Sequence, residues 1–297
     1  MPGKFDTVGL QPLFNRTFVE AYKPADESKI MFFEPTQFPD TMGVLGGIVW
    51  NLGFTNPPGG EIGSAVHVLN DHTYCCQLDP AVCATGEPNP SYKDKCEEWH
   101  NKRLAVRDQD AQRLGVPLFI SEFGACLNSS VCIDEINQVG DSCDEHLAGW
   151  AYWQMKNFAD LTTSAGTGSE GFYNNDGTLQ DGKVKALART YLQATQGTLK
   201  NMKFYTSNRF FRAQFFVDTS ITEPTNVYYN TEYWYTEGVD IRVFDQAGNT
   251  LSEANGDYKL DLTTSQQAKI TVVKSFLNGQ LLSLQVTPKR SSTSFIE

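Results

Sequence analysis

The sequence predicts an α/β domain over residues 1–197, followed by an antiparallel β-sandwich over residues 198–297. Two observations carry this prediction. Up to about residue 197, short apolar runs alternate with segments of helical periodicity, which is typical of a parallel sheet covered by helices. Beyond that point, short runs rich in β-branched and aromatic residues follow one another with turn residues between them, as in an all-β domain. With 297 residues, 40% of them hydrophobic, the chain is long enough for both domains.

The α/β part is expected to contain four strands, because four short apolar runs stand between helical patterns. Helical spacing predicts a first helix near residues 10–22, and a longer helix that Gly115 terminates. The predicted strands are 30–33, 66–69, 117–121 and 149–153, and the predicted helices are 10–22, 96–114, 132–143 and 184–197.

The sandwich is predicted from six strand-like runs at residues 211–217, 226–229, 239–244, 258–262, 268–273 and 281–286. Asn255-Gly256 marks one of the turns between them. One segment, 228–235, is unusually aromatic. Its side chains are interpreted as core and edge residues of the sandwich, and contact with a membrane surface is the alternative.

Composition excludes some functions. A net charge of −11 and an isoelectric point near 4.9 argue against nucleic-acid binding, which needs a basic surface. No run of about 18 apolar residues is present, so no membrane span is predicted. The first residues, Met1 to Asp6, lack the apolar region of a signal peptide.

The cysteines predict disulfides in surface loops. All seven lie between positions 75 and 143, none forms a CxxC pair, and the chain has only four histidines, which disfavours a zinc site. Disulfides in turn indicate a protein of the secretory route. Two glycosylation triplets, at Asn15 and Asn128, fit the same interpretation.

The sharpest chemical signal is Glu122, which follows the apolar run Phe119-Ile120 and precedes Gly124. A carboxylate at the carboxyl end of a buried parallel strand occupies the rim where α/β barrels carry out catalysis. An ordinary acidic residue that opens a loop is the alternative.

A second signal follows the predicted strand 66–69. His72 and Tyr74 are two residues apart in an extended segment and therefore project to the same side. There they would orient a nearby carboxylate or hydrogen-bond a sugar. A loop histidine beside a packed tyrosine is the alternative interpretation.

The third signal is the run Gly149-Trp150-Ala151-Tyr152-Trp153, with three aromatic residues in four positions. A tryptophan at a barrel rim offers a flat apolar face on which a pyranose ring stacks. Alternation of faces assigns core packing to Trp150 and a ligand role to Trp153, whereas core packing of both is the alternative.

Together, these motifs resemble glycoside hydrolase family five, in which His-x-Tyr, the nucleophilic Glu and a Trp end strands six, seven and eight of a (β/α)8 TIM barrel. The chain is most similar to the endoglycoceramidase branch. The resemblance also rests on the segments 10–14, 30–35, 53–60 and 187–198, and it extends loosely into the sandwich. It implies that residues 1–197 represent only barrel strands five to eight.

The resemblance implies an activity and the residues that perform it. The reaction is cleavage of the bond between an oligosaccharide and ceramide, with retained configuration and with no metal or other cofactor. Glu122 is then the nucleophile, with His72, Tyr74, Trp153 and Glu34 as substrate-binding or supporting residues. The expected partner is a glycosphingolipid or another glycoside, and the expected location is secreted, lysosomal or vacuolar.

One part of the family's machinery is missing from this sequence. A retaining glycosidase needs two carboxyl groups about 5 Å apart, and the family's acid/base lies in an Asn-Glu-Pro motif, which does not occur here. The nearest string is Phe33-Glu34-Pro35, which aligns with strand five instead. We therefore expect an N-terminally incomplete chain. The alternatives are an inactive carbohydrate- or glycolipid-binding protein and a purely structural module with a barrel remnant.

Overall fold

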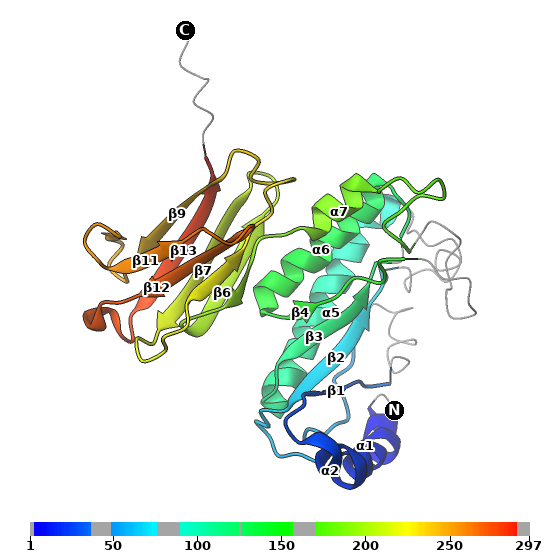
Figure 1. Cartoon of the computed structure of the whole chain (residues 1–297). Coiled ribbons are helices and arrows are strands. Elements are labelled where there is room, and N and C mark those ends of the chain that lie inside the picture. Colours follow the sequence, from blue (N-terminus) through cyan, green and yellow to red (C-terminus); the bar gives the residue numbers. More distant parts are fainter. Residues whose placement is uncertain (1–2, 37–48, 76–89, 125, 157–169, 290–297) are drawn as a thin grey trace. The chain divides into compact units, whose positions relative to one another are not determined.

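The structure is a computed structural model that describes residues 3–36, 49–75, 90–124, 126–156 and 170–289 (Figure 1). The chain forms two compact units, Met1–Val184 and Lys185–Glu297. No helix in the described ranges is long and apolar enough to span a bilayer.

The first unit contains a four-stranded sheet in the order β1-β2-β3-β4, in which every neighbouring pair is parallel. Its strands are β1 (Met31–Phe33), β2 (His67–Thr73), β3 (Leu118–Phe123) and β4 (Gly149–Trp150). All four predicted strands are therefore present. Two extend further than the apolar runs indicate, so that His72 and Glu122 lie inside β2 and β3. The last is shorter, because after Trp150 only an isolated bridge joins Gly124 to Trp153.

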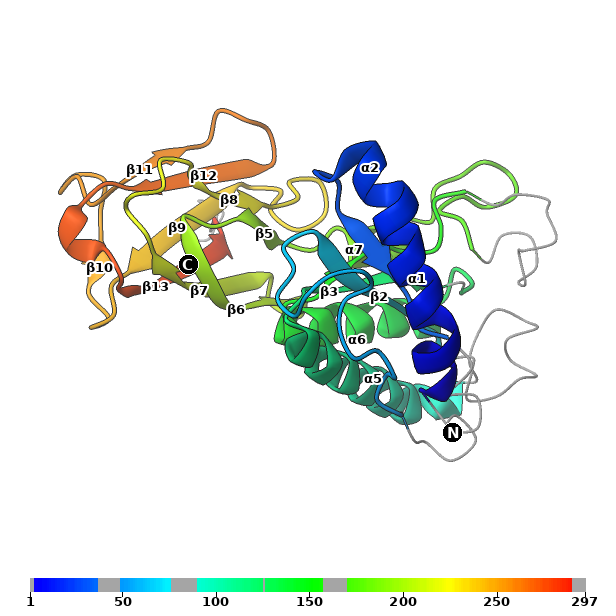
Figure 2. The same cartoon turned by 90° about the horizontal axis from the view of Figure 1, so that it is seen from below.

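Two long helices lie side by side against one face of this sheet (Figure 2). The first, α5 (Lys93–Leu114), ends where Gly115 adopts a left-handed conformation with φ of 66°. The second, α6 (Ser130–His146), begins at Ser129, whose hydroxyl accepts a hydrogen bond from the Cys132 N–H. Both helices were predicted, and Gly115 ends the first of them as the sequence indicates.

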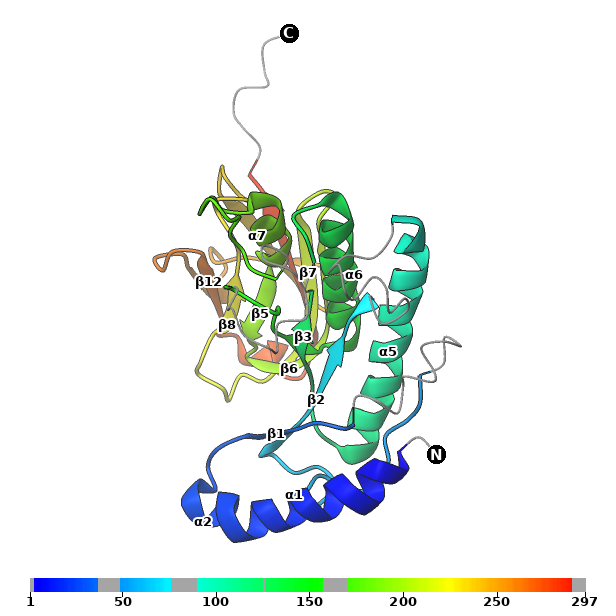
Figure 3. The same cartoon turned by 90° about the vertical axis from the view of Figure 1, so that its right-hand side faces the viewer.

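The amino-terminal residues form a helical segment made of four consecutive pieces, at the amino end of β2 (Figure 3). Phe18 of this segment packs against His67, the first residue of β2. Asp6 accepts hydrogen bonds from the Thr36 and Gly53 backbone N–H groups. The pieces are Asp6–Leu10, α1 (Gln11–Thr17), Phe18–Tyr22 and α2 (Lys23–Asp26).

Two disulfides tie the loops at the carboxyl ends of the strands to the helices. Cys75, just after β2, pairs with Cys96 in α5. Cys126, after β3, pairs with Cys132 in α6. Both agree with the prediction of disulfides, and two further predicted positions, Cys76 and Cys83, lie outside the described residues.

The second unit is a β-sandwich of two antiparallel sheets, ordered β10-β9-β13-β7-β6 and β11-β12-β8-β5. Alternate residues of the strands point into one aromatic-rich core that includes Phe204, Phe211 and Tyr235. The strands are β5 (Tyr191–Ala194), β6 (Gly197–Tyr205), β7 (Phe210–Val217), β8 (Thr225–Tyr228), β9 (Val239–Phe244), β10 (Thr250–Leu251), β11 (Tyr258–Asp261), β12 (Gln267–Val272) and β13 (Leu281–Pro288).

One prediction near the sandwich is wrong, and a choice between two interpretations of its aromatic segment is decided. The predicted helix 184–197 is wrong: α7 (Asp181–Leu187) stops early and β5 follows, because Leu192 is buried in the sandwich core. The structure accordingly divides the chain at Val184 rather than at residue 197. In the aromatic segment 228–235, Tyr229, Trp234 and Tyr235 are buried in the core, so the core interpretation of these side chains is confirmed.

Candidate active site at the carboxyl ends of the parallel strands

Glu122 is the penultimate residue of β3, and its side chain is 27% exposed. It therefore faces an accessible region although the neighbouring Phe123 is buried. The turn that follows requires glycine. Gly124 has φ of 105°, and a Cβ at this position would lie 2.1 Å from the ring of Tyr152.

His72 lies between two carboxylates. Its Nδ1 is 3.3 Å from Glu122 Oε2, and its Nε2 is 3.5 Å from Glu34 Oε2. A register irregularity in the β2–β3 pairing between Asp71 and His72 brings His72 opposite Glu122. A single imidazole thus touches a carboxylate from β3 on one side and a carboxylate that follows β1 on the other.

Tyr74 donates a hydrogen bond from its hydroxyl to Glu122 Oε2 at 2.9 Å. Burial raises the pKa of the Tyr74 phenol, and the negative charge and hydrogen bond of Glu122 raise it further. The phenol therefore stays protonated and remains a donor to the carboxylate at neutral pH. His72 and Tyr74 both reach the same oxygen of Glu122. Their spacing in an extended segment predicts that the two side chains project to one side.

Glu34 immediately follows β1 and is 33% exposed. Besides His72, it accepts a hydrogen bond from Asn70 Nδ2 at 3.2 Å. Phe33, which occupies the position before it, points into the core, where it packs edge-on against Phe54. The chain therefore passes from the buried Phe33 at the end of β1 to the accessible Glu34 directly after it.

Trp153 is held beside β3 by a hydrogen bond from its backbone N–H to the Phe123 carbonyl at 2.9 Å. Its side chain is partly exposed, and a cis peptide bond joins it to Gln154. Trp150 is also partly exposed and contacts the Phe123 ring edge-on. The ligand role of Trp153 stays a prediction.

Two groups near these residues were not predicted from the sequence. Glu170 is buried and accepts a hydrogen bond from Gln154 Nε2 at 3.1 Å. Asp71, the neighbour of His72, is fully buried and is paired with Arg103 and Arg107 of α5. Arg103 and Arg107 did leave a signal in the sequence, since they stand four residues apart on the face of α5 that also carries the apolar Trp99.

No group of three or more His, Cys, Asp or Glu side chains with the geometry of a metal site occurs in the described parts of the chain. The side chains around Glu122 instead present a carboxylate that is oriented for reaction. A partly exposed carboxylate is held by one phenol and one imidazole, which leaves its other oxygen available to react.

The raised pKa of Tyr74 predicts a stability effect in alkali. Above about pH 10 the unfolded chain loses this proton while the folded chain keeps it, so stability falls as pH rises, by about 1.4 kcal/mol per pH unit for one such group. Tyr74→Phe is expected to make that slope shallower, whereas the exposed Tyr173→Phe is not. Urea unfolding at several alkaline pH values measures this, and equal slopes in all three proteins would contradict the assigned environment of Tyr74.

Comparisons with known proteins identify the family. Residues 53–159 match Cellulase (glycosyl hydrolase family 5), and residues 189–274 match the Glycoside hydrolase family 5 C-terminal domain. Both matches are to glycoside hydrolase family 5. The first match covers His72, Tyr74, Glu122 and Trp153, and the second covers most of the sandwich.

Within family 5, the resemblance is to the endoglycoceramidase branch. The chain is 25% identical over 282 residues to an endoglycoceramidase of Cyanea nozakii, covering 93% of this chain and 50% of that protein. It also resembles endo-glycoceramidase II from Rhodococcus sp. The complex of that protein with ganglioside GM3 has a TM-score of 0.68 and 21% identity, covering 98% of this chain and 56% of the other. Its lactosyl-enzyme intermediate has a TM-score of 0.64, 21% identity and the same coverage.

These family 5 relatives are longer than this chain, which spans about half of their length. The solved structures support an α/β fold of the TIM-barrel type with antiparallel sheets at its C-terminal end.

Proposed function

We propose that this chain carries the nucleophile half of a retaining glycoside hydrolase that cleaves the oligosaccharide–ceramide bond of glycosphingolipids, or a related β-glucoside. The observation that carries the proposal is the contact of Tyr74 and His72 with one oxygen of Glu122. Such contacts orient a carboxylate for attack on an anomeric carbon and leave its second oxygen available. The relatives support the substrate class, because one of them is a complex with a ganglioside.

In this mechanism, Glu122 attacks the anomeric carbon and forms a glycosyl-enzyme, while a second carboxyl group protonates the departing ceramide oxygen. Water then hydrolyses the intermediate, with the second group acting as base. The lactosyl-enzyme intermediate of the Rhodococcus protein supports the same two-step route here. Within the site, Trp153 is proposed to stack on the sugar.

We assign the acid/base to a carboxyl group outside residues 1–297, and we assign the four parallel strands to barrel strands five to eight. Glu34 fits the acid/base role poorly, because the His72 imidazole lies between it and Glu122, in contact with both. In a retaining site the sugar occupies the space between the two carboxyl groups. Glu34 is better placed to hold His72 and to contact substrate hydroxyl groups.

The test of this function is an assay of the protein purified from its source with a lactosylceramide substrate. We expect ceramide and free lactose as products, and NMR of the first-formed sugar should show the β-anomer. An inverted product would contradict the proposal. Binding of the glycolipid without any hydrolysis would instead support the alternative, an inactive glycolipid-binding protein, which the missing Asn-Glu-Pro motif favours.

A secreted, lysosomal or vacuolar location is part of the proposal, and the disulfides Cys75–Cys96 and Cys126–Cys132 support it.

This location predicts glycosylation at Asn128 but not at Asn15. Asn128 is exposed in the loop before α6, whereas Asn15 lies in α1 and its Oδ1 accepts hydrogen bonds from Gly59 N and Gln11 Nε2.

The glycosylation prediction is checked by the intact mass of the secreted protein before and after enzymatic removal of N-glycans. Asn128→Gln should abolish the mass change, and Asn15→Gln should leave it as it was. Loss of the mass change only in Asn15→Gln would show that the exposure of the two sites does not decide which one is modified.

A further inference from the structure

The outer face of the five-stranded sheet carries a row of cations. The strand register places Lys203 of β6 opposite Arg212 of β7, Arg212 opposite Gln285 of β13, and Gln285 opposite Arg242 of β9. Three of the four positions in this row are therefore positively charged. Arg212 and Arg242 are both exposed.

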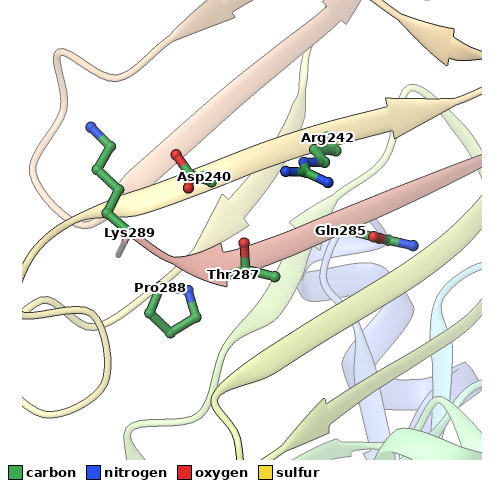
Figure 4. Close-up of a pocket in the computed structure, with 6 residues that line it drawn as sticks. All are labelled: Asp240, Arg242, Gln285, Thr287, Pro288 and Lys289. Carbon is green, nitrogen blue, oxygen red and sulfur yellow. The ribbon is translucent and has the colours of Figure 1, made fainter. Parts of the chain in front are cut away.

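A hollow of about 740 Å³ opens at one end of this row (Figure 4). Its lining includes Arg242 and Asp240 from β9 and Gln285 from β13, and Lys289, which directly follows β13, stands at its edge. We call Lys203, Arg212, Arg242 and Lys289 the cationic face. Asp240 is the carboxylate that borders it.

The cations of the cationic face form no ion pairs with the described carboxylates. Like charges directly opposite each other on neighbouring strands destabilise a sheet, yet Lys203 and Arg212 occupy such positions. None of the four cations forms an ion pair with a carboxylate anywhere in the described ranges. Four cations that form no ion pair in the part of the chain that the structure describes, two of them directly opposite each other, indicate a surface that meets an external anion.

The distribution of charge along the chain points the same way. Residues 185–297 contain twelve Lys and Arg against ten Asp and Glu, whereas residues 1–184 contain twelve against twenty-five. The net charge of −11 therefore arises entirely from the first unit. The sandwich is the part of this acidic protein that an anionic surface does not repel.

The next row of the same face favours a lipid surface over an oligosaccharide. Asn201 donates to Gln214 at 2.8 Å, and Gln214 donates to Ser283 at 2.9 Å, so these polar side chains bond to one another instead of being free for sugar hydroxyl groups. Two residues further along β7 and on the same face, Phe216 is 43% exposed. Several separated cations beside an exposed aromatic ring suit a surface that carries many negative charges.

We propose that the cationic face docks on a bilayer leaflet that contains anionic phospholipids. The contact is electrostatic, made by Lys203, Arg212, Arg242 and Lys289 with lipid phosphate and carboxylate groups. It concerns binding alone and holds whether or not Glu122 is catalytic. For a hydrolase of membrane glycolipids, it would supply the attachment that brings the protein to its substrate.

The experiment is co-sedimentation of the full chain with vesicles of phosphatidylcholine alone or with added phosphatidylserine, at low and at physiological ionic strength. We expect binding only to the vesicles with phosphatidylserine, and weaker binding at the higher salt. Arg212→Gln with Arg242→Gln should weaken partitioning about 30-fold, because each basic residue near an anionic surface contributes roughly fivefold. Lys203→Gln with Lys289→Gln gives an independent pair of the same charge change.

The matched control is Lys259→Gln with Lys269→Gln, which removes two charges from the other sheet, on β11 and β12. It should retain nearly all binding. Equal weakening by the control would overturn the proposal, because net charge alone would then decide. Equal binding to neutral vesicles, or no binding to phosphatidylserine at low salt, would also overturn it. Binding of soluble 3′-sialyllactose that depends on Arg212 and Arg242, without vesicle binding, would assign the face to acidic glycans instead.

Discussion

Glu122→Gln is expected to lower turnover of a 2,4-dinitrophenyl β-lactoside by at least about 10⁴-fold, with no change in thermal unfolding. The amide is isosteric with the carboxylate but cannot attack the anomeric carbon. Because dinitrophenolate departs without protonation, formation of the glycosyl-enzyme from this substrate requires the nucleophile but not the second carboxyl group, so release of the first equivalent of dinitrophenolate reports on Glu122.

Two variants sharpen this test. Glu122→Gly with added azide should restore release of dinitrophenolate and yield an α-lactosyl azide, since azide then attacks from the side that Glu122 occupied. Glu34→Gln should retain measurable release, because Glu34 contacts His72 rather than the reacting carbon in this account. Substantial turnover by Glu122→Gln, or its loss in Glu34→Gln alone, would contradict the assignment of the nucleophile.

Asp71→Ala is expected to destabilise the protein by about 3–5 kcal/mol. Asp71 is fully buried, and it accepts hydrogen bonds from Arg103 Nη2 at 2.9 Å and from Arg107 Nε. Its removal leaves two buried guanidinium groups without their shared carboxylate. Because Asp71 also accepts the His72 backbone N–H at 2.8 Å, the loss should be accompanied by weaker activity on the dinitrophenyl substrate.

The control for Asp71 is the exposed pair of Lys93 and Asp134, at 2.8 Å between α5 and α6. Asp134→Ala should cost no more than about 1 kcal/mol, because solvent screens such pairs. Urea denaturation measures both variants. Similar losses in the two would contradict the structural importance assigned to the buried network.

Acid adds an independent check of the Asp71 network. Burial alone would raise the pKa of Asp71, but Arg103, Arg107 and the His72 N–H outweigh it and hold that pKa below its usual range. A carboxyl group with a lowered pKa stabilises the fold above its unfolded pKa of about 4, and this contribution is lost as pH falls through the folded value. The difference in stability between wild type and Asp71→Ala should therefore be constant from neutral pH down to about pH 5 and shrink in stronger acid.

Local sequence patterns located most of the candidate site. Glu122 stood out because an apolar run ends in a carboxylate followed by glycine, and His72 and Tyr74 stood out because residues two apart in a strand share a side. These signals lie within a few neighbouring residues. What they could not reveal is that His72 reaches Glu34 as well, since that contact joins segments brought together only by strand pairing.

The buried network was missed for a related reason. Arginine is normally an exposed residue, so the position of Arg103 and Arg107 on the Trp99 face of α5 does not by itself indicate that they are buried. Their burial depends on Asp71, more than thirty residues earlier in the chain. Only the packing of α5 against the sheet makes the three residues neighbours.

Two secondary-structure elements were hidden by conflicting local patterns. The helical spacing near residue 187 continues into Tyr191 and Leu192. These two residues nevertheless form the strand β5, because they pair with β8. In β6, a register irregularity between Leu199 and Asn201 interrupts the alternation of buried and exposed residues. Single-sequence periodicity cannot resolve either case, because both are decided by partners distant in the chain.

The most direct test of the central claim is covalent trapping with 2,4-dinitrophenyl 2-deoxy-2-fluoro-β-lactoside. The fluorine slows hydrolysis of the glycosyl-enzyme, and the reactive leaving group removes the need for a general acid. We expect the intact mass to rise by one 2-deoxy-2-fluorolactosyl group, and peptide mapping to place that group on Glu122. A label on any other residue, or a folded protein that stays unlabelled at high reagent concentration, would contradict the account.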